Sequence, residues 1–150
     1  MHTVVERELE LDLVLSPEHS IAVPTRLTYR TADPYAVHIS FHIHSEHPVN
    51  WTFARELLVE GVFRPSGNGD VRLWPTKRNG CNVILLALSS PDGEALLEAS
   101  SEVVSAWLER TLRVLPPGCE SERLGIDDAL AELLAPTVAD DRPQDQDVDG

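Results

Sequence analysis

Four histidines stand close together in the sequence, at His38, His42, His44 and His47. Imidazole is a common metal ligand and can also act as a base. A strand would place the first three on one face, but residues at i and i+2 are spread over about 7 Å. No aspartate or cysteine stands at metal-ligand spacing between them. We therefore interpret the cluster as a polar sheet face or a subunit interface, and we predict no bound metal.

The sequence gives equally little support for a nucleophilic serine or for a phosphate-binding loop. Ser89 and Ser90 precede a turn, and neither lies in the G-x-S-x-G pattern of an activated nucleophile. The glycine-rich loop at residues 67–70 lacks the lysine of a phosphate-binding loop and precedes a strand rather than a helix. We therefore predict that the protein is not an enzyme and binds no cofactor.

Arginines within apolar segments suggest a different kind of chemistry. Arg55, which is followed by Glu56, and Arg72 could each pair with an internal carboxylate or bind a partner's carboxylate. The internal ion pair is the interpretation we favour. Lys77 and Arg78 form the one adjacent basic pair, and the aromatic residues fall mainly at core-compatible positions, so a stacking platform for bases is poorly supported.

The charge of the chain also argues against nucleic-acid binding. The net charge is −13, and residues 136–150 carry −4 of it through five aspartates and one arginine, which leaves −9 for residues 1–135. Such a field repels nucleic-acid phosphates and anionic membranes. No apolar run approaches the ~20 residues of a membrane span, and the N-terminus lacks a signal-peptide pattern. We expect a cytoplasmic protein in which Cys81 and Cys119 are free thiols.

The elements follow from periodicity and turn residues. Alternating apolar positions predict strands at 9–15, 21–29, 37–43 and 49–53, and Pro24 makes the first half of the second an edge or a bend. A short helix at 54–60 ends at Gly61. Strands then follow at 71–74, ended by Pro75, at 83–89 and at 94–99, with an Asn79-Gly80 hairpin turn. Helical spacing predicts a helix at 101–115 and a final one from Asp127 to Pro136.

This order, ββββαβββαα, predicts an α+β domain with antiparallel sheets or a barrel and packed helices. The domain should span residues 1–135, and residues 136–150 should form an acidic disordered tail. Two apolar pairs are candidates for self-association, Val4 with Val5 and Val62 with Phe63.

Four phrases together carry a resemblance to a known family. They are TADPYAVH at 31–38, WTFARELLVEG at 51–61, GDVRLWP at 69–75 and LSSPDGEALLEA at 88–99. In this order and spacing the chain resembles the SsgA-like proteins of morphologically complex actinobacteria, most closely the SsgB-type branch. The resemblance runs from about residue 4 to about residue 135.

The resemblance implies a regulator of sporulation-specific cell division that is not an enzyme. It implies a cytoplasmic protein at division septa that helps to position or recruit FtsZ, with FtsZ and other SsgA-like proteins as partners. It also implies a homotrimer whose fold is similar to Whirly-type single-stranded nucleic-acid-binding proteins. Single-stranded nucleic-acid binding is therefore the alternative function, although the negative charge opposes it.

Five charged residues in these phrases are not required by a core and are our candidates for a partner-binding surface. They are Asp33, Arg55, Glu56, Asp70 and Arg72. Internal ion pairs are the other interpretation of the same residues.

Overall fold

The computed structural model describes residues 2–42, 47–121 and 133–134. Within these ranges the chain forms seven strands and two defined helices. The strands are β1 (Val4–Ser16), β2 (His19–Arg30), β3 (Ala36–Phe41), β4 (Val49–Ala54), β5 (Val71–Arg78), β6 (Cys81–Ser90) and β7 (Gly93–Ser100). The helices are α1 (Arg55–Gly61) and α2 (Ser101–Val114).

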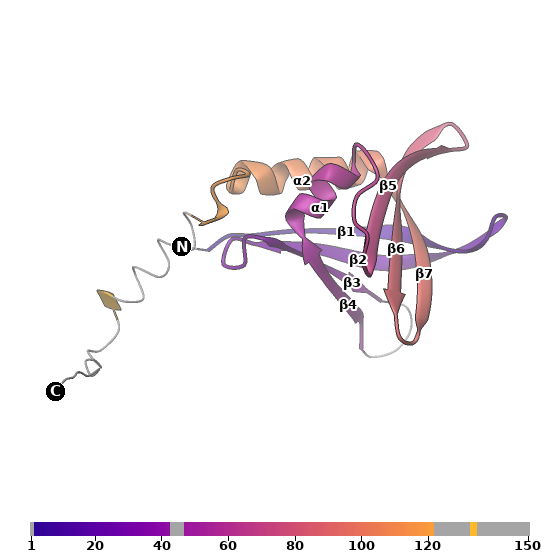
Figure 1. The fold of residues 1–150 in the computed structure, drawn as a ribbon, viewed down its shortest axis with the longest axis horizontal. Helices are drawn as coiled ribbons and strands as arrows, with labels where there is room; N and C mark the ends of the chain where they lie inside the picture. The colour runs from indigo at the N-terminus through magenta and orange to yellow at the C-terminus, as the bar shows by residue number, and fades with distance from the viewer. Residues whose placement is uncertain (1, 43–46, 122–132, 135–150) are drawn as a thin grey trace.

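All strands belong to one antiparallel sheet in the order β4-β3-β2-β1-β7-β6-β5. The strands β1 to β4 form one meander and β5 to β7 form another, and the two join where Asp12 and Leu13 of β1 pair with Glu98 and Leu97 of β7. Figure 1 shows that the sheet curls, with α1 connecting the two edge strands β4 and β5. The predicted α+β class with antiparallel strands is confirmed.

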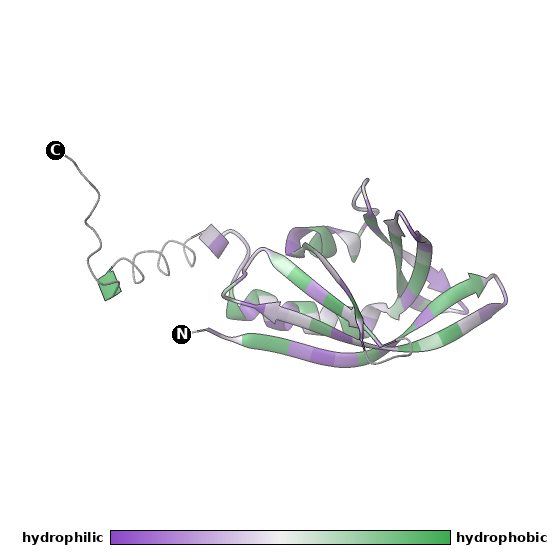
Figure 2. Cartoon of the chain, turned by 90° about the horizontal axis from the view of Figure 1, so that it is seen from below, coloured by the Kyte–Doolittle hydropathy of each residue, from purple (hydrophilic) through white to green (hydrophobic). Residues whose placement is uncertain are grey.

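The core lies inside the curl because each strand turns one apolar face inward. Buried side chains from both meanders and both helices meet there and enclose a small cavity of about 30 Å³, lined among others by Leu11, Ile39 and Leu86. The alternation of hydrophobic and hydrophilic residues along the strands is visible in Figure 2. This cavity has room for about one water molecule at most, so it is a packing defect and not a ligand site.

Helix α2 closes one side of the curl. Ser100 caps its first turn by accepting a hydrogen bond from the Val103 amide at 3.3 Å. Trp107, which is 1% exposed, packs into the core, and its indole Nε1 donates a hydrogen bond to the Val5 carbonyl at 3.2 Å. The helix therefore holds the first strand as well as the second meander.

Helix α1 is short, and close packing fixes its C-terminal end. A Cβ atom at Gly61 would lie 2.8 Å from the Cβ of Leu73 in β5. Only glycine lets the helix and the strand approach this closely. Gly61 is thus both the last residue of α1 and its contact with β5.

Two prolines show where sequence reasoning about strands succeeds and fails. The first half of β2 pairs with β1 alone, as Pro24 predicted, because β3 pairs only with Thr25 to Thr28. The prediction that Pro75 ends its strand is wrong, since β5 continues to Arg78 and Pro75 faces Ile84 of β6. An edge strand has a partner on one side only, so it can accommodate a residue without an amide hydrogen.

The other predicted boundaries agree with the structure to within about two residues, except that β1 begins at Val4, well before the predicted start at Leu9. Asn79 and Gly80 both have positive φ angles, 53° and 79°, as a two-residue hairpin turn of the primed type requires. The predicted third strand is shorter than expected, because β3 ends at Phe41. The predicted helix from Asp127 and the tail at 136–150 lie outside the described residues, apart from Leu133 and Leu134.

The two candidate pairs for self-association differ in their exposure. Val5 is buried in the core, so only its neighbour Val4 is exposed. Val62 is half-buried, whereas Phe63 is 74% exposed. Val4 and Phe63 therefore both keep an exposed apolar surface, and Phe63 is the larger and more exposed of the two.

Candidate functional site

Asp33 lies in the turn between β2 and β3, on the surface. Its amide donates to the Arg30 carbonyl at 3.0 Å, and its carbonyl accepts from the Ala36 amide at 3.2 Å. Its carboxylate Oδ2 lies 3.1 Å from Nε2 of His38, whose Nδ1 lies 3.0 Å from the Thr52 hydroxyl. Asp33 therefore remains exposed but is oriented by an imidazole on the neighbouring strand.

The histidine cluster does not assemble a metal centre in the described chain. His38 is engaged by Asp33 and Thr52, and β3 ends before His42 is reached. His44 lies outside the described residues. Over the ranges 2–42, 47–121 and 133–134, no three histidine, cysteine, aspartate or glutamate side chains gather as metal ligands would.

Arg55 lies in the interior and not on the surface, with 2% of its side chain exposed. Its Nη1 donates to the Thr111 carbonyl of α2 at 3.0 Å, and its Nη2 lies 2.8 Å from Oε2 of Glu120. The guanidinium carbon also stacks 4.6 Å from the centre of the Tyr29 ring. This burial is the outcome that the internal ion-pair interpretation predicts, with Glu120 as the partner.

Glu120 also fixes the segment that follows α2. Its Oε1 accepts a hydrogen bond from the Gly118 amide at 2.8 Å while its other oxygen binds Arg55. Burial alone would raise the pKa of Glu120, but the hydrogen bonds from Arg55 and from backbone amides, with the charge of Arg55, outweigh it. The pKa of Glu120 is therefore lowered below its ordinary value near 4.5.

A cleft opens above this ion pair, and we call it the Arg55 cleft. It has a volume of about 420 Å³ and is lined by Tyr35, Arg55, Glu56, Val59, Pro117 and Glu120, among others. Tyr35 is 51% exposed and Glu56 is exposed at the first turn of α1. The structure thus brings Arg55 and Glu56 together in this cleft, with Asp33 two residues from Tyr35.

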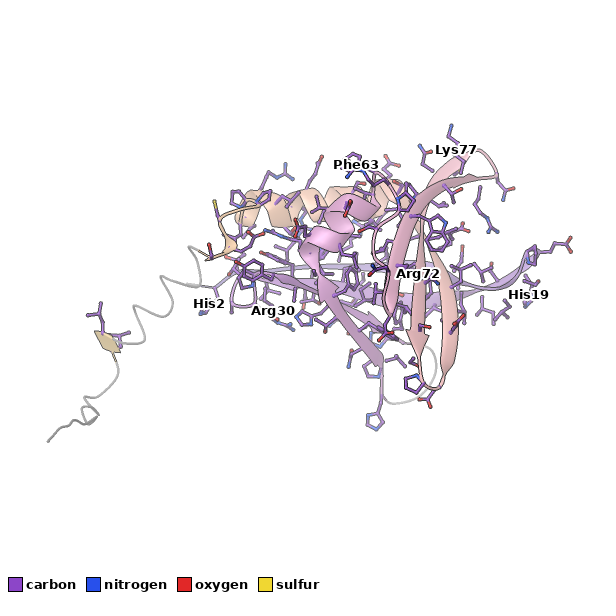
Figure 3. The ribbon with its side chains drawn as sticks, in the orientation of Figure 1. His2, His19, Arg30, Phe63, Arg72 and Lys77 are labelled. Atoms are coloured by element: carbon purple, nitrogen blue, oxygen red, sulfur yellow. The ribbon has the colours of Figure 1, made fainter. Side chains whose placement is uncertain are left out.

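Asp70 and Arg72 lie elsewhere, at the beginning of the edge strand β5. Both side chains are exposed, and the Asp70 carbonyl accepts a hydrogen bond from the Ser89 amide at 2.9 Å. Figure 3 labels Arg72 on this strand. Neither residue lines the Arg55 cleft, so the five predicted residues do not form one continuous site.

A second hollow, which sequence reasoning missed, lies where the two meanders face each other at the open end of the curl. We call it the apolar groove. It has a volume of about 250 Å³, and its walls include Leu13, Phe41, Val49, Trp51, Leu88 and Leu97. Asp92 and Glu94, at the turn between β6 and β7, add two carboxylates to its lining.

The signal for the apolar groove was present in the alternation of β4. Val49, Trp51 and Phe53 point to the same face, and their exposure falls from 45% at Val49 to 8% at Phe53. Periodicity in the sequence identifies the apolar face of a strand, but it does not show how much of that face is covered by other elements of the fold. The groove is the part of the inward face that no other element covers in the described chain.

The basic pair at Lys77 and Arg78 is partly engaged within the protein. Arg78, of the basic pair, is bound by Glu98 at 3.2 Å between Nε and Oε1. No helix within the described ranges is both long enough and apolar enough to span a bilayer.

The chain is similar to known proteins in both sequence and structure. The family model for the Streptomyces sporulation and cell division protein SsgA matches residues 23–120. The sporulation-specific cell division protein SsgB of Streptomyces coelicolor is 51% identical over 135 residues, which cover 90% of this chain and 98% of that protein. The SsgB of Frankia casuarinae is 42% identical over 133 residues, covering 89% of this chain and 93% of the relative.

Two solved structures have the same fold. One, from a study of SsgB mutations in Streptomyces coelicolor sporulation, has a TM-score of 0.79 and 53% identity, and the match covers 82% of this chain and 97% of that chain. The other, an SsgA-like sporulation-specific cell division protein from Thermobifida fusca, has a TM-score of 0.80 and 39% identity, with coverages of 88% and 96%. The chain therefore belongs to the SsgA family of sporulation and cell division proteins.

Proposed function

We propose that this protein regulates sporulation-specific cell division by contact with other proteins, and that it helps to position or recruit FtsZ at septum sites in the cytoplasm. The observation that carries the proposal is the 51% identity that extends over 98% of Streptomyces coelicolor SsgB. A match along the whole relative includes its surface as well as its core.

The described surface supports a docking role. Glu56 borders the Arg55 cleft, while Asp33, Asp70 and Arg72 are exposed. Exposed charges of this kind set the orientation and rate of encounter with a partner more than they set raw affinity. We propose that these four residues contact the partner, and that Arg55 acts indirectly by fixing the floor of the cleft.

We also propose that the fold of this protein is similar to that of Whirly-type proteins and that the protein forms a homotrimer. Neither requires nucleic-acid binding, because one fold serves many functions. The net charge of −13 opposes a phosphate backbone. Fluorescence anisotropy with labelled single-stranded oligonucleotides at low salt separates the two functions, and binding at micromolar protein would favour the nucleic-acid alternative.

Charge reversal at Glu56 should weaken the contact with FtsZ. The Glu56→Arg variant places a cation at the mouth of the Arg55 cleft, and we expect its dissociation constant for polymerised FtsZ to rise about tenfold, or about 1.4 kcal/mol. Interferometry with the immobilised protein and FtsZ polymers measures the change.

Glu109→Arg is the matched control, because Glu109 is exposed on α2 and the charge change is the same. It should bind as the wild-type protein does. Equal binding by the Glu56→Arg and Glu109→Arg variants would exclude Glu56 from the contact. Absence of binding by the wild-type protein would mean that an intermediary connects it to FtsZ.

A further inference from the structure

Among the described residues, no element covers the aromatic and aliphatic surface of the apolar groove. Trp51 is half-buried and Val49 is 45% exposed, although both belong to the inward face of β4. The carboxylates of Asp92 and Glu94 stand beside this surface. Among the residues that the structure describes, neither carboxylate takes part in an ion pair. The groove therefore fits a ligand that offers an apolar group next to a cation.

The chain itself carries such a group directly after α1. Phe63 is 74% exposed, the highest value for any aromatic residue in the described ranges, and Arg64 follows it with 67% of its side chain exposed. Their backbone is held, because the amides of both residues donate to the Glu60 carbonyl at 3.0 Å. We call Phe63 and Arg64 the Phe63 knob.

Both members of the knob would gain from burial against a partner. Transfer of an exposed phenylalanine side chain from water to an apolar surface is favourable. Arg64 has one exposed ion pair, with Glu60 at 3.3 Å, and such pairs contribute little. Against the groove, the ring would meet apolar walls while the guanidinium would meet Asp92 and Glu94. The knob and the groove thus both offer apolar surface, and their charges are opposite.

Their positions exclude a contact within one molecule. In Figure 3, Phe63 lies at the top beside α1, whereas the turn between β6 and β7, which carries Asp92, lies at the bottom. A knob and a groove on different sides of a protomer give a head-to-tail contact, which closes into a ring or continues as a filament.

We propose that the Phe63 knob of one copy docks in the apolar groove of a second copy. The contact joins copies of this chain head to tail and assigns residues to the proposed homo-oligomer. It is separate from the contact with FtsZ, so its test uses the purified full-length protein alone. Failure of this test leaves the proposed role in division untouched.

The test is the molar mass in solution over a concentration series, measured by sedimentation velocity. The Phe63→Asp variant loses the knob, and we expect its self-association constant to weaken at least thirtyfold, as for a central aromatic hot spot. The Val49→Asp variant places a charge in the groove and should weaken association similarly. Val114→Asp, at an apolar position on α2 that is 40% exposed, is the matched control and should associate as the wild type does.

Mixing the two defective variants gives the sharpest result. The Val49→Asp protein keeps its knob and the Phe63→Asp protein keeps its groove, so an equimolar mixture should form a dimer through one intact contact and nothing larger. An Arg64→Glu variant should associate weakly, and Asp92→Arg in the same chain should restore part of the affinity.

Several outcomes would overturn the proposal. They are a wild-type protein that stays monomeric throughout the series, a Phe63→Asp variant with wild-type mass, and a Val114→Asp variant that dissociates as readily. A mixture that remains monomeric while each variant is folded, as judged by circular dichroism, would also overturn it.

Discussion

Replacing Arg55 with alanine should lower the free energy of unfolding by about 3–5 kcal/mol, the typical cost of removing one partner from a buried ion pair. The substitution would leave the Glu120 carboxylate, with 14% of its side chain exposed, without its cation. It would also remove the donor to the Thr111 carbonyl and leave a cavity beneath the Tyr29 ring. Denaturant unfolding measures the loss as a shift in the midpoint.

Arg72→Ala is the matched control for this prediction. Arg72 is exposed on the edge strand, so its removal should change stability by no more than about 0.5 kcal/mol. A loss below about 1 kcal/mol for Arg55→Ala would show that the ion pair is not a structural support. The Arg55→Lys variant keeps the charge without the forked geometry and should fall between the two.

The same ion pair should make stability depend on pH in one direction. Because the pKa of Glu120 is lower in the folded protein than in the unfolded chain, its contribution is complete above the ordinary carboxyl pKa near 4.5. It is lost as the pH falls through the lower, folded value. The Glu120→Gln variant should therefore lose less stability on acidification than the wild type does, and parallel pH profiles would contradict this.

Replacing Trp107 with alanine should cost about 3–5 kcal/mol, because it empties the largest of the fully buried side-chain sites in the described core. The indole joins α2 to β1 through its hydrogen bond to the Val5 carbonyl at 3.2 Å. Trp107→Phe keeps most of the apolar contact but loses this bond, so it should cost less. Thermal and denaturant unfolding together give both values.

Glu109→Ala, on the exposed side of the same helix, provides the control for Trp107. Alanine is a strong helix former and the Glu109 side chain is exposed, so the effect should stay within about 0.5 kcal/mol. Equal losses for Trp107→Ala and Glu109→Ala would mean that α2 is not anchored through its indole.

Much of the fold follows from local pattern because the strands have one buried face each. Alternation along residues 9–15 and helical spacing along 101–115 both locate elements that the structure contains. Pro75 shows the limit of that reasoning, since its effect depends on whether its strand is at an edge. Strand order is a tertiary property, and no single segment encodes it.

The candidate site was less predictable for the same reason. Arg55 belongs to a recognisable phrase, but its burial depends on Glu120 and Thr111, which lie 65 and 56 positions away in the sequence. The apolar groove combines residues of both meanders, so it exists only after the sheet has curled. Sequence identified charged and apolar stripes, while the distinction between core, cleft and surface required the packed structure.

The most direct measurement for the proposed role is the position of fluorescently labelled FtsZ in sporulating hyphae that lack this protein. We predict that FtsZ fails to gather at regularly spaced septum sites, and that a wild-type copy of the chain restores the spacing while the Glu56→Arg copy restores it poorly. Regular FtsZ rings and normal septa in the deletion strain would contradict the proposal that this chain positions the division machinery.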